Sequence, residues 1–464
     1  MYRQKDINTI MENIDDIKNG ASTIYKSHYE PTINEISKVY NAIKKYIKDN
    51  NKIVYGGFAQ NLLVLDKNKN DGFYKEIDGA FYNWPDLADI EFYSSTPIDD
   101  LVDLTEYLFS LGFKHIEGKE GIHPETYKIF VNFLNYCDIT YIPPNIYNNL
   151  PVIKVDGVLC AHPHFMMIDA YRILNDPMTS YWRLEKPLKR FQKLIEYYPM
   201  NNTNNVDKSK KVILDPIDKE IHRFINKKII HKSNFILVGY NAFNHYSKKM
   251  SEETYDLQFF EIINNDDNAF EKNARDIYKI LNNKFPHKIK IKEFNPFYNF
   301  MDYRIEYYYN NKLVLRLYNN YERCTVYNYS QKKFTYYGTF NLTFMYMLYN
   351  YFYSIINKDT KQINNYLILC NKLYDIRNNY LEKNNLSVLD NSPFQDFTYK
   401  CFGTPKDPIR EAFLNYVDKK NKKKLIKFKY SPSGKKIRTP DYMFSNTSGN
   451  QVINKKYLIF KNNI

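Results

Sequence analysis

Apolar side chains recur at helical spacing in several segments of the first 200 residues. From 32 to 48 they stand three or four positions apart, after the capping pattern Thr32-Ile33-Asn34-Glu35, which predicts an amphipathic helix. Similar spacing predicts helices over 97–111, begun by Pro97, and over 165–174. A basic helix is predicted from 181 to 197, and Pro187 would bend or restart it.

Strands are predicted where short apolar runs or alternating patterns occur. Residues 52–55 form a short apolar run that meets Gly56-Gly57 and then a segment of helical composition. Alternation over 88–93 predicts the next strand, and two more are predicted at about 128–133 and 136–142. The polar stretch from 67 to about 84 is predicted to be a loop. This mixture predicts an α+β fold.

A later part of the chain repeats the earlier pattern. The matched segments are Ile53–Asn61 with Ile236–Asn244, Asp89–Tyr93 with Asp256–Phe260, and Phe165–Ile168 with Phe344–Met347. The polar stretch 201–211 between the copies is predicted to be a linker. In this alignment the second copy has lost its carboxylates: Gln258 replaces the glutamate, and the segment around Arg316 offers no aspartate.

Composition limits the kinds of partner and the cellular compartment that the chain fits. The 464 residues include 66 Lys and Arg against 52 Asp and Glu, a net charge of +14, which favours a polyanionic partner such as nucleic acid or nucleotide. No apolar stretch is long enough to span a membrane and no secretion signal is present, so a soluble cytoplasmic protein is expected. The 17% of aromatic residues accompanies many Asn, Ile and Lys, all encoded by A/T-rich codons, and does not itself indicate base stacking.

Cysteines, histidines and the tail give weaker signals. Five scattered cysteines predict neither a disulfide framework nor a cysteine zinc site. The segment Cys160-Ala161-His162-Pro163-His164 lacks a complementary ligand pair, so packed histidines are expected there. The lysine-rich tail from Asp418 onward is either a solvated tail or an arm that contacts a phosphate backbone, and charge alone does not choose between them.

Three carboxylates and a glycine pair form the candidate chemistry. Asp89 and Glu91 are two positions apart on a predicted strand, so both side chains point to the same face. Asp138, on a later predicted strand, would add a third carboxylate. Such a cluster favours two Mg²⁺ or Mn²⁺ ions and suits phosphoryl transfer. Gly56 and Gly57, lacking Cβ atoms, would let backbone N–H groups at a helix start approach a triphosphate.

This order of motifs resembles the polymerase-β-type nucleotidyltransferases. Within that superfamily, the segments Tyr55–Asn61 and Ala88–Ser94 most resemble the catalytic poly(A) polymerases of large cytoplasmic DNA viruses, nearer to giant viruses than to poxviruses. Two features depart from the common pattern. Asp89 follows Gly57 by 32 positions, which implies an inserted loop, and the second acidic residue is Glu rather than Asp. A competing pair, Glu76 and Asp78, is closer to the glycines but has a poorer apolar frame.

The resemblance implies a template-independent transfer of AMP from ATP to RNA 3′ ends. Asp89, Glu91 and Asp138 would be the catalytic and metal-binding residues. The residues expected to bind the nucleotide are Gly56, Gly57, Asn61, Arg183, Lys186 and Arg190. If helical, the last three form a cationic row on one face. The expected partners are ATP, the RNA 3′ end and a second copy of the chain, in the host cytoplasm or viral factory, with packaging into the virion also open.

The implied organisation has four parts. They are a helical N-terminal segment (1–50), a catalytic nucleotidyltransferase module (51–200), a degenerate second module (212–400) and a basic C-terminal region (401–464). Two rival functions stay open. One is another nucleotidyltransferase, acting on tRNA ends, a small molecule or a protein. The other is an inactive RNA-binding subunit, against which the intact carboxylates of the first copy argue.

Overall fold

The protein is described here from a computed structural model. It describes residues 2–28, 31–83, 86–121, 125–200, 217–232, 234–250, 255, 258–264, 266, 269–294, 303–319, 324–403, 410, 413–414, 428–433 and 459–460. The chain divides into two compact units. The first unit comprises Met1–Ile142, Val152–Ala161 and Lys419–Met443, and the second comprises Pro143–Pro151, His162–Asp418 and Phe444–Ile464.

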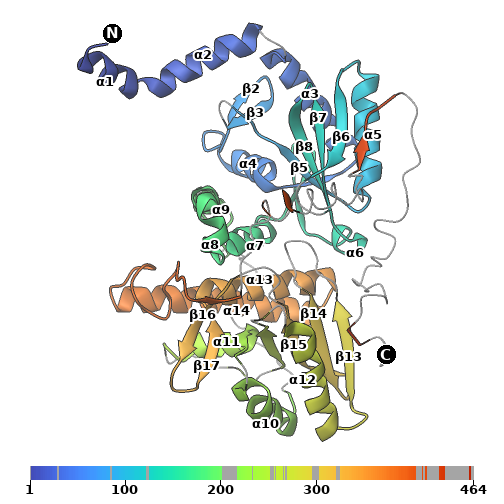
Figure 1. Ribbon diagram of the computed structural model, residues 1–464, viewed down its shortest axis with the longest axis vertical. Coiled ribbons are helices and arrows are strands. Elements are labelled where there is room, and N and C mark those ends of the chain that lie inside the picture. The colour runs from blue at the N-terminus through green and yellow to red at the C-terminus, as the bar shows by residue number, and fades with distance from the viewer. Residues whose placement is uncertain are drawn as a thin grey trace. The chain divides into compact units, whose positions relative to one another are not determined.

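The first unit is built on one eight-stranded sheet (Figure 1). Its helices are α1 (Gln4–Glu12), α2 (Ile14–His28), α3 (Ile33–Asp49), α4 (Gly56–Lys67) and α5 (Pro97–Ser110). Its strands are β1 (Ile53–Tyr55), β2 (Lys75–Ile77), β3 (Ala80–Asn83), β4 (Asp86–Leu87), β5 (Ile90–Ser94), β6 (Ile116–Glu120), β7 (Thr126–Val131), β8 (Leu134–Tyr141), β9 (Val152–Val155), β10 (Val158–Ala161) and β19 (Lys429–Tyr430). The order across the sheet is β19-β6-β7-β8-β5-β1-β10-β9, and α4 and α5 pack against it.

Local sequence explains where these helices begin. The Thr32 hydroxyl accepts the Glu35 N–H and caps α3, which buries Val39 and Ile43 on its apolar face. Pro97 begins α5, where its missing N–H has no intrahelical acceptor to lose. The predictions of helices over 32–48 and 97–111 are confirmed.

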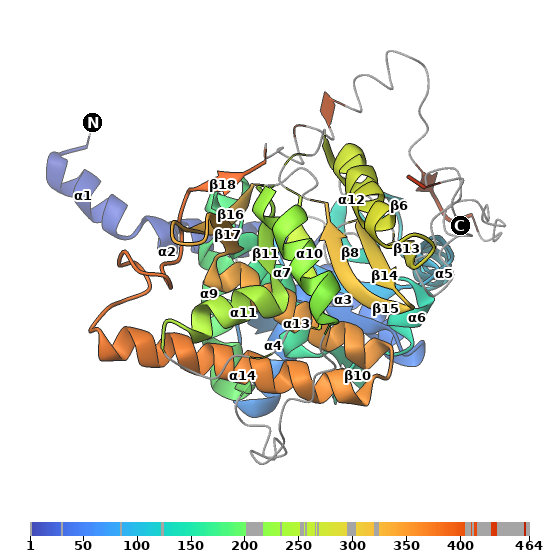
Figure 2. The same cartoon turned by 90° about the horizontal axis from the view of Figure 1, so that it is seen from below.

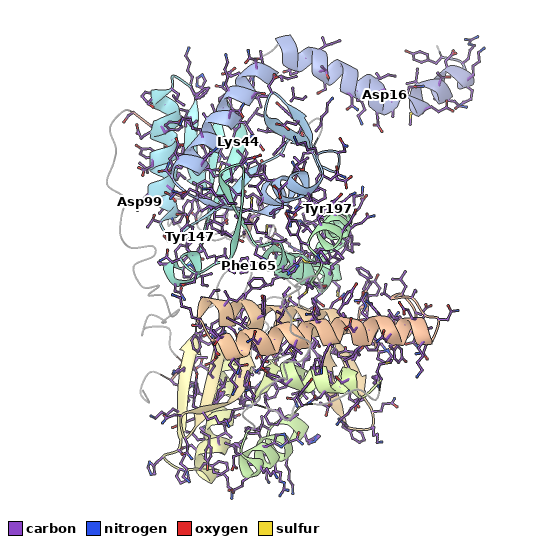
Figure 3. The ribbon with its side chains drawn as sticks, turned by 180° about the vertical axis from the view of Figure 1, so that it is seen from behind. Asp16, Lys44, Asp99, Tyr147, Phe165 and Tyr197 are labelled. Atoms are coloured by element: carbon purple, nitrogen blue, oxygen red, sulfur yellow. A yellow bond between two sulfur atoms is a disulfide. The ribbon has the colours of Figure 1, made fainter. Side chains whose placement is uncertain are left out.

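The predicted loop between residues 67 and 84 is wrong in part, because it contains strands. β2, β3 and β4 form a separate three-stranded sheet. A tight turn joins β2 to β3, since Asp78 and Gly79 both take positive φ, 49° and 80°. Helix α3 holds this turn: Asn41 donates to the Asp78 carbonyl at 2.8 Å, and Lys44, labelled in Figure 3, donates to the Gly79 carbonyl at 3.0 Å. The polar composition of this stretch does not reveal the hairpin, because the hairpin depends on contacts with α3, which is distant in sequence.

The second unit contains another eight-stranded sheet, of order β13-β14-β15-β12-β11-β17-β16-β18. Its helices are α6 (Pro144–Tyr147), α7 (Pro163–Leu174), α8 (Pro177–Ser180), η1 (Tyr181–Arg183), α9 (Glu185–Tyr197), α10 (Lys219–Lys228), η3 (Ile230–Lys232), α11 (Gly239–Ser247), α12 (Phe270–Lys284), α13 (Phe340–Ile356) and α14 (Thr360–Lys383). Its strands are β11 (Ile236–Val238), β12 (Phe260–Ile263), β13 (Ile289–Phe294), β14 (Arg304–Tyr309), β15 (Lys312–Tyr318), β16 (Thr325–Ser330), β17 (Thr335–Gly338) and β18 (Cys401–Phe402). Figure 2 shows α13 and α14 running side by side with α11 beside them.

The second sheet repeats the first, strand by strand. β11 takes the place of β1, because each is flanked by one antiparallel strand (β12 or β5) and one parallel strand (β17 or β10). The next strand inward, β15 or β8, is parallel in both sheets, and the hairpins β14–β15 and β7–β8 are antiparallel. Each hairpin carries a register shift at the same place, between Ile129 and Phe130 and between Tyr307 and Tyr308. The predicted internal repeat is thus present in the backbone.

Register corrects the sequence alignment of the two copies. Tyr55 pairs with Glu91, and Val238, at the position of Tyr55, pairs with Glu261. Glu261 therefore corresponds to Glu91, and the matches of Gln258 with Glu91 and of Asp256 with Asp89 are wrong. The sequence match was made on Asp256 and the pair Phe259-Phe260, whereas the register places the counterpart of Glu91 three positions further along, at Glu261.

Helix α7, predicted at 165–174, belongs to the second unit and packs on α13. Phe165, labelled in Figure 3, meets Phe352 of α13 edge to face, with 5.3 Å between ring centroids. His162 caps α7 by accepting the His164 N–H, and His164 bonds the Tyr198 carbonyl at 2.7 Å. Burial lowers the pKa of His162 to about 3, which fits packed neutral histidines.

The predicted basic helix over 181–197 is divided into two elements. Arg183 lies in the 3-10 turn η1 and α9 begins at Glu185, so Arg183, Lys186 and Arg190 are not on one continuous α-helix. A disulfide joins Cys324 and Cys401, which the scattered cysteines did not predict.

The linker 201–211 and most of the basic tail lie outside the described residues, although Lys429 of that tail pairs through β19 with β6 of the first unit. No helix in the described part of the chain is both long and apolar enough to cross a membrane.

Candidate active site

A strand, a glycine turn and a helix start build the first part of the site. Tyr55 ends β1, and Gly56 begins α4 with φ of +64°. A Cβ at Gly56 would collide with the carboxylate of Glu91. The Gly57 N–H donates to Glu91 Oε2 at 2.9 Å. Glycine is therefore required here both for its backbone conformation and for the close approach of a carboxylate.

Two of the predicted carboxylates are neighbours on adjacent strands. Glu91 on β5 and Asp138 on β8 are direct register partners in a parallel pair, so their Cα atoms lie about 5 Å apart. Asp89 stands just before β5, two residues from Glu91, and is exposed. The competing pair, Glu76 and Asp78, lies on the separate three-stranded sheet or its turn.

The negative charges of the three carboxylates raise the pKa of a buried group nearby. Burial raises the pKa of the Cys137 thiol well above its ordinary value, and the charges of Asp138, Asp89 and Glu91 raise it further, whereas Lys128 opposes them. Burial also raises the pKa of Tyr55, and Glu91 and Asp138 reinforce that shift. Both groups are thus kept neutral beside concentrated negative charge.

Lys128 pairs closely with Asp138. Its ammonium lies 2.7 Å from each carboxylate oxygen, and Asn135 donates to the same carboxylate at 3.1 Å. Lys128 and Asp138 are register partners on β7 and β8. This lysine was not among the residues predicted from the sequence.

The donor set suits a divalent cation in its chemistry. Carboxylate oxygens are the ligands that Mg²⁺ and Mn²⁺ prefer, and they are supplied by Asp89 just before β5, Glu91 on β5 and Asp138 on the neighbouring strand β8. Within the described ranges, however, no group of three or more His, Cys, Asp or Glu side chains already surrounds a cation position. Glu91 Oε2 accepts the Gly57 N–H and both oxygens of Asp138 contact Lys128, so a shared metal ion would compete with these contacts.

The corresponding centre of the second unit keeps the backbone and changes the charges. Gly239 has φ of +60°, and a Cβ there would collide with Glu261, just as at Gly56 and Glu91. The register places Arg316 where the first unit has Asp138, and Glu306 where it has Lys128. Phe259 stands where the first unit has Asp89. The second unit thus retains the glutamate and loses the other two carboxylates.

Arg316 fills the second centre with a buried cation. Its guanidinium lies 3.2 Å from Glu261 and 2.9 Å from Glu306, and these three side chains are at most 6% exposed. Tyr318 and Asn350 also donate to Glu261, at 2.9 and 3.0 Å. Burial alone would raise the pKa of Glu306, but Arg316 and Arg304 hold it below its ordinary value. The second centre is an internally neutralised ion network.

The other residues predicted to bind the nucleotide are either buried in a structural contact or part of the second unit. Asn61 is fully buried on α4, and its side-chain oxygen accepts the Phe73 N–H at 2.7 Å, which holds the segment after the helix. Arg183, Lys186 and Arg190 belong to the second unit, and Arg183 lies over the Trp182 ring. Nucleotide binding by these four residues stays a prediction.

Comparisons with known proteins point to the same family in both parts of the chain. Family models match residues 41–180, as poly(A) polymerase catalytic subunit, and residues 192–462, as the C-terminal part of the mimivirus poly(A) polymerase catalytic subunit. A poly(A) polymerase catalytic subunit of Acanthamoeba polyphaga mimivirus is 30% identical, covering 99% of this chain and 84% of that protein. One from African swine fever virus (strain Badajoz 1971 Vero-adapted) is 24% identical over 36% of this chain and 34% of its own length.

A solved structure extends the agreement to the fold. The crystal structure of the Megavirus polyadenylate synthase superposes with a TM-score of 0.86 at 29% identity, covering 99% of this chain and 94% of that one. The resemblance inferred from the glycine turn and the carboxylates is therefore confirmed. The chain belongs to the poly(A) polymerase catalytic subunit family, in the group of giant-virus enzymes, and is a nucleotidyltransferase.

Proposed function

We propose that the chain adds AMP from ATP to RNA 3′ ends without a template, forming mRNA poly(A) tails, with a catalytic centre in the first unit that uses two divalent cations. The observation that carries this proposal is the register pairing of Glu91 with Asp138 beside the Gly56-Gly57 turn. It puts acidic groups next to a helix N-terminus, where a triphosphate also binds favourably.

The roles of the residues follow from their positions. Asp89 and Glu91 would hold both cations, and Asp138 would hold the one nearer the RNA 3′-hydroxyl. When bound, Mg²⁺ or Mn²⁺ activates the attacking hydroxyl and stabilises the leaving pyrophosphate. The N–H groups at the start of α4 would bind the triphosphate, including that of Gly57, which in the structure donates to Glu91.

In the transfer step, the RNA 3′ oxygen forms a bond to the α-phosphorus of ATP. The bond from that phosphorus to the oxygen bridging to the β-phosphorus breaks, pyrophosphate leaves with the electron pair, and the hydroxyl proton passes to solvent. Arg183, Lys186 and Arg190 would contact the nucleotide or RNA backbone. The proposal includes a homodimer acting in the host cytoplasm or viral factory, with packaging in the virion as a further expectation.

Extension of a labelled short RNA tests this function. The purified chain is incubated with each of the four nucleotides separately and Mg²⁺ or Mn²⁺, beside an Asp89→Ala/Glu91→Ala variant. Long ladders with ATP alone, absent from the variant, support the proposal. Short additions with CTP would favour a tRNA-end enzyme. RNA binding without any extension would contradict catalysis by the chain alone.

A further inference from the structure

A close ion pair at the candidate active site joins a predicted metal ligand to a lysine. Lys128 contacts both oxygens of Asp138 at 2.7 Å, and the two side chains are only 27% and 17% exposed. An ammonium at this distance from both oxygens occupies directions from which a divalent cation would also approach the carboxylate. The pair therefore opposes metal binding at Asp138.

The second unit places another ion pair at the same two strand positions, with the charges exchanged. Glu306 and Arg316 occupy the positions of Lys128 and Asp138, and their side chains are 2.9 Å apart. The register shift that brings each pair face to face is present in both hairpins. Both units therefore neutralise charge at this point of the sheet, and only in the first unit does the pair contain a candidate metal ligand.

The surrounding charge also differs. In the first centre, Asp138 is the register partner of both Glu91 and Lys128, and Asp89 stands two residues before Glu91, so three acidic side chains accompany this one lysine. In the second centre, Glu261 and Glu306 are grouped with Arg316 and Arg304, which together are neutral. A dication therefore complements the first set and not the second.

We propose that Lys128 is the resident counter-ion of Asp138: it holds the carboxylate in place when no metal is bound, and competes with the divalent cation for it. Lys128 is thus a positioning residue that sets metal affinity. This inference rests on the proposed function, because it takes Asp138 to be a metal ligand.

Titration of the full-length chain with Mn²⁺, followed by electron paramagnetic resonance without nucleotide, tests the proposal. Lys128→Met is compared with the wild type, with Lys128→Arg, and with Lys119→Met. The last variant removes a lysine from neighbouring strand β6, where it pairs with Glu117. Removal of a positive charge within a few ångströms of the cation is expected to tighten Mn²⁺ binding at least about tenfold in Lys128→Met. Lys128→Arg and Lys119→Met are expected to bind within about threefold of the wild type, since the first keeps the charge at the site and the second removes a more distant one.

Thermal unfolding without metal supplies the second readout. Lys128→Met should unfold at a lower temperature than the wild type, and Mn²⁺ should restore more of that loss than it adds to the wild type. Lys128→Met/Asp138→Asn should regain metal-free stability, because both charges are gone. If Lys128→Met does not fold, Lys128→Gln is used in both measurements.

Unchanged or weaker Mn²⁺ binding in a folded Lys128→Met or Lys128→Gln variant would overturn the proposal. A different result would refute the proposed function itself: wild-type Mn²⁺ binding that is unaffected by Asp89→Asn/Glu91→Gln would place the metal elsewhere. The two failures are therefore distinguishable.

Discussion

Glu91 in the first unit and Glu261 in the second occupy the same strand position, and each packs against a glycine that begins a helix with positive φ. Their neighbours differ. Glu91 stands beside Asp138, whereas Glu261 stands beside Arg316. One backbone thus carries a carboxylate cluster in one copy and a closed ion network in the other.

This difference separates structural from chemical roles. The glycine, the glutamate and the register shift persist in the copy that lacks the other two acids, so they support the turn and the sheet whether or not chemistry occurs. Asp89 and Asp138 have no acidic counterpart in the second unit. Those two positions therefore distinguish an acidic centre from a neutral one.

The largest expected effect is on catalysis. Glu91→Gln should lower the rate of AMP addition by about 10³-fold, since loss of a metal ligand removes several kcal/mol of transition-state stabilisation. Glu261→Gln, the same substitution in the second unit, should leave the rate within about threefold of the wild type in protein that thermal unfolding shows to be folded. Equal losses in the two variants would mean that both glutamates serve catalysis.

The next effect is on stability. Arg316→Met leaves Glu261 without its buried cation and Glu306 with Arg304 alone, and should destabilise the second unit by about 3–5 kcal/mol in chemical denaturation. Lys128→Met should cost less, about 1–2 kcal/mol, because its pair with Asp138 is partly exposed. Arg316→Met/Glu261→Gln, which leaves Glu306 paired with Arg304, should recover part of the loss. A larger loss of unfolding free energy in Lys128→Met than in Arg316→Met would contradict the conclusion that the Arg316 network is the more deeply buried of the two.

The glycine turns should respond alike in stability and differently in activity. Gly56→Ala and Gly239→Ala each force an unfavourable positive φ, at a cost of about 1–2 kcal/mol, and displace a glutamate. Gly56→Ala should also slow AMP addition, measured by primer extension, whereas Gly239→Ala should not. A slower reaction in both variants would mean that the second turn also serves catalysis.

The smallest expected effect is on how the stability of the fold depends on pH. The dependence has opposite signs at a buried group of the first unit and one of the second. Burial raises the pKa of Glu125, just before β7, to about 7, so its contribution to stability is present below pH 4.5 and is lost as pH rises through 7. Burial, with nearby lysines, lowers the pKa of His245 on α11 to about 4, so stability is present above pH 6.5 and is lost as pH falls through 4. Unfolding of Glu125→Gln and His245→Gln at several pH values should show each dependence flattened. An unchanged slope in either variant would contradict that assignment.

Much of the fold could be predicted from the sequence, because its signals are local. Capping at Thr32, Pro97 at a helix start and the strand–glycine–helix order around Gly56 each depend on a few adjacent residues. The hairpin at 75–83 was missed because its turn depends on contacts from α3. The ranges 1–50, 51–200, 212–400 and 401–464 stay predictions of functional parts. The compact units divide differently, since 162–200 packs with the second unit.

The candidate site could be predicted only as a set of acidic positions. Lys128 and Arg316 were missed because their partners depend on strand register. A regular hairpin about the turn at Asn132-Phe133 would place Lys128 opposite Cys137, and the register shift moves it opposite Asp138. A period-2 pattern does not reveal such a shift. The same shift makes Arg316 the partner of Glu306.

Crystals of the chain soaked in Mn²⁺, with data collected at the manganese absorption edge, would show directly which of the two centres binds the metal. Anomalous density is expected beside Asp89 and Glu91 in the first unit, and none beside Glu261. Anomalous density beside Glu261 and Glu306, or its absence beside Asp89 and Glu91 in crystals that bind Mn²⁺ elsewhere, would mean that the acidic centre of the first unit is not the metal site.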